Sequence, residues 1–213
     1  MILVKNVYLS YTKEYYTLNN INLEVNKGEN VVLFGEKESG KSSLLRVIAG
    51  LEKATKGNVY LDGTEINKVD FKNSFNLGYI SSTGVYLNNK TVKQNLEYVL
   101  KIRKEHKDVI KSKVANALIR YNLESLANER VYTLGEYDKL KLSIARLSLR
   151  KVDLFLIDDI FENLSKKEED SIIKYLKELL LVEDVTSVIA VNKKSTAEKF
   201  NGRKIKIEFG SIE

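Results

Sequence analysis

One segment constrains the fold of this chain more than any other part of the sequence. It fits the pattern G-x-x-x-x-G-K-[ST] and reads Gly35-Glu36-Lys37-Glu38-Ser39-Gly40-Lys41-Ser42. An apolar, strand-like run at residues 31–34 precedes it, and a helix-like run at residues 44–49 follows it. A phosphate-binding loop needs this strand–loop–helix context, in which small residues let the backbone curl. The segment therefore predicts a P-loop, and the alternative is a chance glycine turn before an ordinary helix.

The chemistry of such a loop assigns roles to its residues. Successive backbone N–H groups point at phosphate oxygens, and the N-terminus of the following helix adds a dipole that favours anions. We expect the Lys41 ammonium group to reach the β- and γ-phosphates and the Ser42 hydroxyl to ligate Mg²⁺. The residues expected to bind nucleotide here are Gly35, Glu36, Lys37, Glu38, Ser39, Gly40, Lys41, Ser42 and Ser43.

A second apolar run supplies the carboxylate that a P-loop needs to hold Mg²⁺. Residues 154–157 read Leu-Phe-Leu-Ile, and Asp158 follows them directly. An acidic residue at the end of a buried strand is typical of the Walker B position, although an ordinary buried strand capped by an aspartate has the same appearance. Asp158 is therefore the expected partner of Ser42 at the metal.

The composition limits the class of protein. A chain of 213 residues, 43% of them hydrophobic, is long enough for one α/β domain with a real core. It has no Cys and one His, which excludes disulfides, thiol chemistry and a multi-histidine metal centre. The net charge of +6 comes from basic residues interleaved with acids, which favours a solvated surface over an anionic membrane face and over nucleic-acid binding. The sequence shows no signal-peptide pattern and no apolar run of membrane-spanning length, so we expect a cytosolic location.

Strand-like and helix-like segments alternate along the chain. Period-2 patterns and apolar runs predict strands at residues 2–10, 18–25, 31–34, 58–61, 77–81, 153–157, 185–191 and 203–209. Helical patterns cover residues 91–121, 140–149 and 165–181, and Gly50 is placed to end the helix after the P-loop. This order predicts an α/β fold with a largely parallel sheet and antiparallel strands near the N-terminus. The long charged helical stretch suggests a helical subdomain within the α/β core.

The chain resembles the ATP-binding subunit of ABC transporters over nearly all of its length. The similar segments occur in the order that the family has them and lie at residues 18–29, 44–51, 57–63, 91–96 and 144–146. The resemblance implies a P-loop NTPase fold of the ABC ATPase type, with a mostly parallel sheet, an N-terminal antiparallel β subdomain and an inserted helical subdomain. Residues 1–213 would then form one ATP-binding domain, with the helical subdomain at about residues 88–150.

The resemblance also implies an adenine contact and a second nucleotide-binding segment. Tyr11 stands where the family keeps an aromatic residue that stacks on adenine, although a surface tyrosine beside Tyr15 and Tyr16 is an alternative interpretation. In the family, ATP lies between the P-loop of one subunit and the L-S-G-G-Q signature of another. The residues at the signature position here are Leu134, Gly135, Glu136, Tyr137 and Asp138. Two acids and a bulky ring replace groups that approach the γ-phosphate, so we expect repulsion there.

The positions that drive hydrolysis in the family are also altered. Asp159 stands at the position of the catalytic glutamate and is shorter by one methylene. Asn192 stands at the position of the switch histidine and carries no proton at neutral pH. Ser82 replaces the glutamine of the Q-loop as a weak Mg²⁺ contact, and Ser165 replaces the aspartate of the D-loop. The resemblance therefore implies ATP and Mg²⁺ binding with slow hydrolysis.

Two functions remain open on this reading. The first is a transporter subunit that binds MgATP, pairs with an identical or different ABC ATPase subunit, and is coupled to a transmembrane permease at the inner face of the cell membrane. The second is a regulatory module that holds ATP with little turnover. Nucleic-acid binding is disfavoured because the chain has no aromatic-rich basic stretch.

Overall fold

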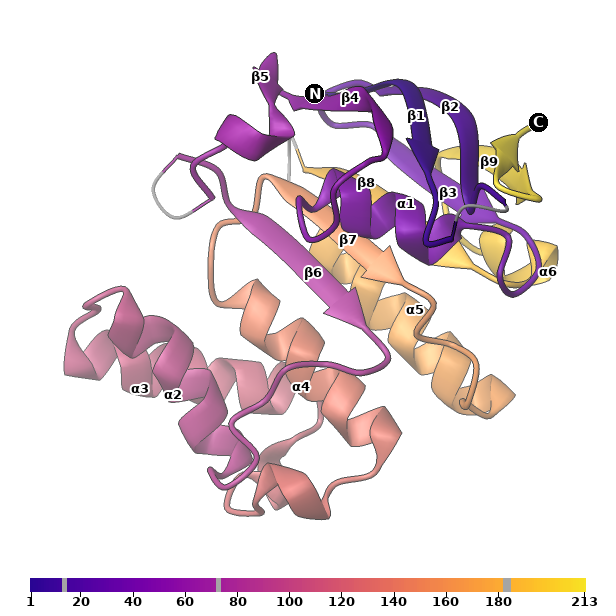
Figure 1. Ribbon diagram of the computed structural model, residues 1–213. Helices are drawn as coiled ribbons and strands as arrows, with labels where there is room; N and C mark the ends of the chain where they lie inside the picture. Colours follow the sequence, from indigo (N-terminus) through magenta and orange to yellow (C-terminus); the bar gives the residue numbers. More distant parts are fainter. Residues whose placement is uncertain (13–14, 72–73, 182–184) are drawn as a thin grey trace. The chain divides into compact units, whose positions relative to one another are not determined.

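The computed structural model describes residues 1–12, 15–71, 74–181 and 185–213 (Figure 1). The chain forms two compact units. The first contains residues 1–81, 152–162 and 180–213, and the second contains residues 82–151 and 163–179. The proposed helical subdomain at residues 88–150 falls within the second unit, which also takes in most of a later helix.

An antiparallel sheet begins the first unit. Its strand order is β2-β1-β4-β5, and every neighbouring pair is antiparallel. The strands are β1 (Ile2–Leu9), β2 (Leu18–Val25), β4 (Lys56–Leu61) and β5 (Thr64–Glu65). In β2, four buried apolar positions are separated by exposed polar ones, as expected for a sheet with one face on the core.

The second sheet of the first unit is mostly parallel. Its strand order is β10-β9-β3-β8-β7-β6, and all neighbouring pairs are parallel except β10 with β9. The strands are β3 (Asn30–Phe34), β6 (Leu77–Ser81), β7 (Leu154–Asp158), β8 (Thr186–Val191), β9 (Arg203–Glu208) and β10 (Ser211–Ile212). Strands β7 and β8 are buried at every position, which is typical of central parallel strands covered on both faces. The carboxyl ends of β3, β7 and β8 therefore meet at one edge of the sheet.

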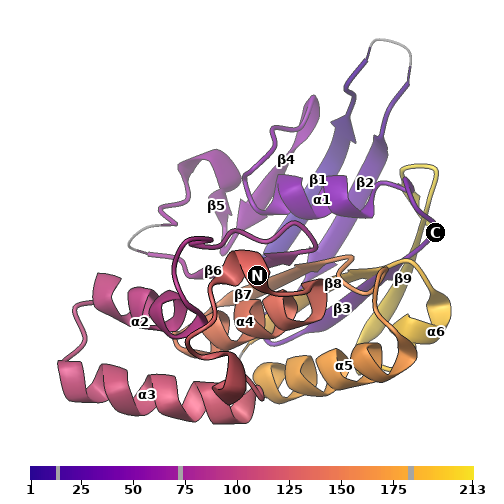
Figure 2. The same ribbon diagram turned by 90° about the horizontal axis from the view of Figure 1, so that it is seen from below.

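Helix α1 (Lys41–Ile48) lies between the two sheets of the first unit (Figure 2). It contacts β1 on one side and β7 and β8 on the other. Four apolar residues of the helix, and Ala49 directly after it, belong to a core cluster that also contains residues from strands of both sheets. The helix ends before Gly50, which has a φ of 69°, as the left-handed C′ residue that the sequence predicts. A short helix, α6 (Lys194–Ala197), and a 3₁₀ turn at Ile66–Lys68 complete this unit.

The second unit is helical. It contains α2 (Val92–Ile102), α3 (Lys107–Arg120), α4 (Glu136–Ser148) and most of α5 (Lys166–Leu180), with 3₁₀ turns at Glu124–Leu126 and Val131–Thr133. Helices α2, α3 and α4 contact one another. A capping box between Thr91 and Gln94 begins α2, which satisfies two of the free N–H groups at the helix start. The single helical stretch expected at residues 91–121 is in fact two helices, because the chain turns at Lys104, whose φ is 57°.

Across the described parts of the chain, no helix has the length and apolar character needed to cross a membrane.

Candidate functional site

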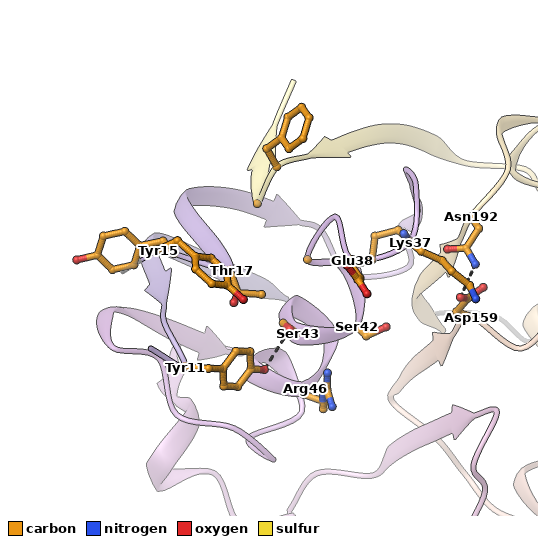
Figure 3. A pocket seen from close by; sticks show the side chains of 15 residues that line it. Tyr11, Tyr15, Thr17, Lys37, Glu38, Ser42, Ser43, Arg46, Asp159 and Asn192 are labelled. Carbon is orange, nitrogen blue, oxygen red and sulfur yellow. Dashed lines mark hydrogen bonds between the residues drawn. The ribbon is translucent and has the colours of Figure 1, made fainter. Parts of the chain in front are cut away.

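A cavity of about 790 Å³ opens beside the N-terminus of α1 in the first unit (Figure 3). Its wall comes from the loop after β3, the first residues of α1, the ends of β7 and β8, and the β1–β2 and β9–β10 connections. An adjoining cavity of about 740 Å³ is lined by residues of the same loop. The loop between β3 and α1 thus lines both hollows.

The loop can follow this path because two of its positions carry no side chain. A Cβ added to Gly35 would lie 2.1 Å from the backbone oxygen of Ile207. Gly40 has a φ of 101°, and a Cβ there would lie 2.8 Å from the backbone oxygen of Thr17. Neither position tolerates a larger residue without backbone movement. The two glycines of the motif are therefore required by close backbone approach, before any ligand is considered.

Lys41 lies buried under the loop. Its Nζ donates to the backbone oxygens of Gly35 at 2.8 Å and Glu36 at 2.6 Å, and to the Ser39 hydroxyl at 3.1 Å. Burial lowers the pKa of Lys41, and the carboxylates of Asp159 and Asp158 oppose that shift. The ammonium group is thus a buried cation held by carbonyl dipoles.

Ser42 lines the cavity, and its side chain contacts the buried Asp158. The Ser42 hydroxyl donates to Asp158 Oδ1 at 2.6 Å, and the Tyr79 hydroxyl donates to Asp158 Oδ2 at 2.7 Å. Burial raises the pKa of Tyr79, and the neighbouring Asp158 carboxylate raises it further, so this phenol stays a proton donor. A hydroxyl and a carboxylate side by side offer the oxygen ligands that Mg²⁺ prefers. Among the described residues, no group of three His, Cys, Asp or Glu side chains is placed to hold a metal ion.

Asp159 follows Asp158 at the end of β7 in a left-handed backbone conformation, with a φ of 43°. The Asn192 amide, at the end of β8, donates to Asp159 Oδ2 at 2.5 Å, as Figure 3 shows. Burial raises the pKa of Asp159, while the Asn192 donor and the Lys41 ammonium group pull it down. Within the described part of the chain, the Asn192 Oδ1 is buried without a hydrogen-bond partner. The structure thus brings together the two residues expected at the hydrolytic positions.

Tyr11 lies at the opposite end of the cavity, where its ring is 56% exposed. Its hydroxyl lies 3.2 Å from Ser43 Oγ and donates to Glu52 Oε2 at 2.8 Å. These contacts hold the hydroxyl beside the first turn of α1, and more than half of the residue's surface stays exposed. Tyr15 and Tyr16 line the same cavity. The expected role of Tyr11 under an adenine ring stays a prediction.

The remaining loop residues surround the two cavities. Lys37 and Glu38 line both, whereas Glu36 and Ser39 line the adjoining one. Lys37 forms an exposed ion pair with Glu162, and this pair raises the pKa of Lys37. One of the loop's two lysines is therefore already engaged with an acid of its own unit.

The signature-position residues lie in the second unit, at the start of α4. Gly135 is the residue before the helix, and Glu136 and Asp138 fall in its first turn, where acids suit the helix dipole. The Tyr137 hydroxyl donates to Ser171 Oγ at 2.9 Å. Lys141, which is buried, lies over the Tyr137 ring at 4.8 Å and pairs with Asp138 at 2.8 Å.

These contacts give the segment partners inside its own unit. Lys141 Nζ also donates to the backbone oxygen of Asn122 at 3.0 Å, and Leu134 is buried. Ser82 directly follows β6 and belongs to this unit. Ser165, also in this unit, accepts and donates in a capping arrangement with Glu168 before α5. The roles of Ser82 and of the signature position toward nucleotide stay predictions.

Several residues of the site are not predicted from the sequence. Tyr79 holds the second oxygen of Asp158, Glu52 holds Tyr11, and Arg46 and Phe209 line the cavity. No motif assigns any of them a role at the site. The one available signal is that Tyr79 lies on the strand expected beside the Asp158 strand, and the register that brings them together appears only in the paired sheet.

The fold and this site define the class of the protein. A parallel sheet, a glycine-bounded loop from β3 to α1, and a lysine, serine and aspartate around it constitute a P-loop nucleotide-binding domain. The model of the ABC transporter family matches residues 18–162, which is more than half of the chain. The chain belongs to the ABC transporter family.

Curated relatives have names that describe import ATP-binding proteins. The chain is 29% identical over 98% of its length to the sn-glycerol-3-phosphate import ATP-binding protein UgpC of Bartonella bacilliformis. It is 29% identical over 100% of its length to the sulfate/thiosulfate import ATP-binding protein CysA of Synechocystis sp., and 26% identical over 100% to the spermidine/putrescine import ATP-binding protein PotA of Legionella pneumophila. The matches cover 60%, 59% and 58% of those proteins, so the chain spans about three-fifths of their length.

Solved structures of ATP-binding cassettes share the fold. A dimeric structure of the cassette MJ0796 in a post-hydrolysis state, bound to ADP and Pi, aligns with a TM-score of 0.86 at 26% identity, covering 100% of this chain and 97% of that one. The structure of cbiO1 from Clostridium perfringens aligns with a TM-score of 0.82 at 20% identity, covering 100% of this chain and 86% of that one. These structures confirm the expected α/β cassette fold with its antiparallel and mostly parallel sheets.

Proposed function

We propose that this chain is the ATP-binding subunit of an ABC-type membrane transporter, at the inner face of the cell membrane. The observation that carries the proposal is that Lys41 and Ser42 line a P-loop cavity and that Asp158 accepts a hydrogen bond from Ser42. The import ATP-binding relatives and the ADP-bound cassette support it by similarity. A permease partner and a second ATPase subunit, identical or different, belong to the same proposal.

The loop itself indicates how triphosphate is bound. Lys41 Nζ contacts the carbonyls of Gly35 and Glu36 and would exchange them for phosphate oxygens, which suits a buried cation better than carbonyl dipoles. Ser42 and Asp158 would hold Mg²⁺, which neutralises charge on the phosphates. Tyr11 would support the base at the far end of the cavity, where its ring is half-exposed.

Hydrolysis is proposed to be slow. Asp159 would orient the attacking water, but its side chain is shorter than that of a glutamate by one bond, about 1.5 Å. A misplacement of about 1 Å costs about 100-fold in rate. Asn192 holds Asp159 at 2.5 Å and cannot carry a proton at neutral pH. The site is thus suited to holding MgATP more than to turning it over.

A second candidate function is a regulatory ATP-binding module of a membrane complex. The signature-position side chains favour it, because Tyr137, Asp138 and Lys141 bond to one another and to neighbours in their own unit. A segment whose polar groups already have partners offers fewer of them to a nucleotide on a second subunit. In a homodimer, both sites would share this defect.

One experiment separates the two functions. The chain is purified from membranes with whatever integral membrane protein accompanies it, and phosphate release from MgATP is measured with and without that partner. Clear stimulation by the partner, abolished by Lys41→Ala, supports the transporter subunit. Co-purification with unchanged, negligible phosphate release supports the regulatory module. Absence of a membrane partner contradicts both.

A further inference from the structure

We propose that the Glu38 carboxylate makes the nucleotide site selective for metal-neutralised nucleotide by repelling free polyphosphate. The inference rests on the proposed function and concerns the same cavity. Glu38 is exposed and lines both hollows beside the loop. In Figure 3 its side chain extends from the loop toward the part of the cavity that Ser42 lines. A carboxylate in this place lies beside the residues that are expected to contact phosphate.

The backbone conformation of Glu38 supports the same inference. Its φ is 63°, a left-handed conformation that glycine adopts freely and that costs other residues conformational energy. Such a residue persists when its surroundings or its function determine it, and strained positions gather at ligand-binding loops. A glycine would adopt this φ without strain, so the glutamate side chain carries a conformational cost here.

Among the described residues, each basic side chain that lines the main cavity also has a partner other than Glu38. Of the described residues, three basic side chains line it: Lys37, Lys41 and Arg46. Lys37 pairs with Glu162 and is also attracted, more weakly, by Glu38. Arg46 Nε lies 3.7 Å from Glu52 Oε2. Lys41 contacts the loop carbonyls and faces Asp158 and Asp159. An incoming phosphate chain therefore meets one buried ammonium group together with the acids Glu38 and Asp159.

This arrangement of charges should make the binding affinity depend on the net charge of the ligand. Metal-free ATP carries about two more negative charges than MgATP, so a fixed carboxylate a few ångströms away repels it more strongly. Removing that charge should raise the affinity for MgATP about threefold and the affinity for metal-free ATP about tenfold. Since the effect is electrostatic at an exposed site, both gains should shrink as ionic strength rises.

The test is a calorimetric titration of the full chain and its variants. MgATP, and ATP with EDTA, are titrated at low and high salt into the wild type, Glu38→Gln and Glu38→Gly. Glu38→Gln removes the charge and keeps the backbone constraint, whereas Glu38→Gly removes both. Glu65→Gln in β5, which does not line either cavity, is matched for net charge. Circular dichroism verifies that each variant is folded.

The inference is supported if Glu38→Gln and Glu38→Gly both gain affinity, more for metal-free ATP than for MgATP, and Glu65→Gln does not. It is overturned if the wild type binds MgATP but Glu38→Gln gains nothing, or gains equally for both ligands at both salt concentrations. A wild type that binds neither ligand overturns the proposed function as well, so the two failures are distinguishable. If only Glu38→Gly gains, backbone strain is the cause and the charge-based inference is overturned.

Discussion

The contact between Tyr79 and Asp158 allows a quantitative prediction, because one atom can be removed without changing the packing. The Tyr79 hydroxyl donates to Asp158 Oδ2 at 2.7 Å, inside the first unit. Tyr79→Phe deletes this donor and leaves Ser42 as the other donor to the same carboxylate. A hydrogen bond to a charged group contributes about 1.5–3 kcal/mol. The free energy of unfolding should fall by that amount.

The assay is urea-induced unfolding of the wild type and the variant at pH 7, followed by circular dichroism. For a chain of this length, the same loss corresponds to a fall of about 3–12 °C in Tm. The control is Tyr132→Phe, because the Tyr132 ring is 56% exposed and a surface change of this kind stays within about 0.5 kcal/mol. A Tyr79→Phe variant as stable as the control would refute the assigned hydrogen bond.

The dependence of stability on alkaline pH tests the same contact. Burial and the Asp158 charge raise the pKa of Tyr79 in the folded chain. The unfolded chain therefore loses the Tyr79 proton first, near pH 10, and the free energy of unfolding falls as pH rises beyond that value. Tyr79→Phe has no such proton, so the stability gap between wild type and variant should narrow above about pH 10.

The remaining predictions concern Asp159 and Lys41. Asp159→Glu restores the longer carboxylate and should raise steady-state phosphate release from MgATP by up to about 100-fold; an unchanged rate would mean that Asp159 does not limit turnover. Because burial lowers the pKa of Lys41 and phosphate raises it again, MgATP affinity should be highest below the lowered pKa and fall as pH rises through it. Titrations between pH 7 and pH 10 measure this fall, and a Lys41→Arg variant that declines in parallel would contradict the assignment to Lys41.

Much of the fold follows from the sequence because its strands are short, apolar and separated by recognisable turns. The predicted bounds of β2 and β6 match the structure, and those of β3, β7 and β8 differ by a residue. Their patterns are strong because central parallel strands are buried on both faces. Helix α1 follows from the P-loop pattern itself, and Gly50 ends it as predicted.

The errors in the predicted fold have identifiable physical causes. The break between α2 and α3 occurs at Lys104, whose left-handed conformation no Gly or Pro announces. Helix α4 begins at Glu136, before its apolar periodicity starts, because two acids in the first turn suit the helix dipole. Elements as short as α6 and β10 have too few residues to show a period.

The candidate site likewise contains residues that the sequence predicts and residues that it does not. The motif pattern places Ser42 and Asp158 on elements whose ends meet, and the structure brings their side chains to 2.6 Å. The motif pattern cannot place Tyr79 or Glu52. The contact of Tyr79 depends on strand register, and the contact of Glu52 depends on a side chain far from Tyr11 in the sequence. The left-handed φ of Glu38 is likewise invisible in the sequence, since the residue type argues against it.

The central claim is that the loop between β3 and α1 binds a triphosphate, and one calorimetric titration tests it most directly. MgATP is titrated into the purified chain and into Lys41→Ala, at the same protein and magnesium concentrations. The account predicts a Kd of about 1 mM or lower for the wild type, because Lys41, Ser42 and Asp158 are grouped at the cavity, and no measurable binding for the variant. Equal affinities in the two proteins, or no heat of binding in the wild type, would contradict it.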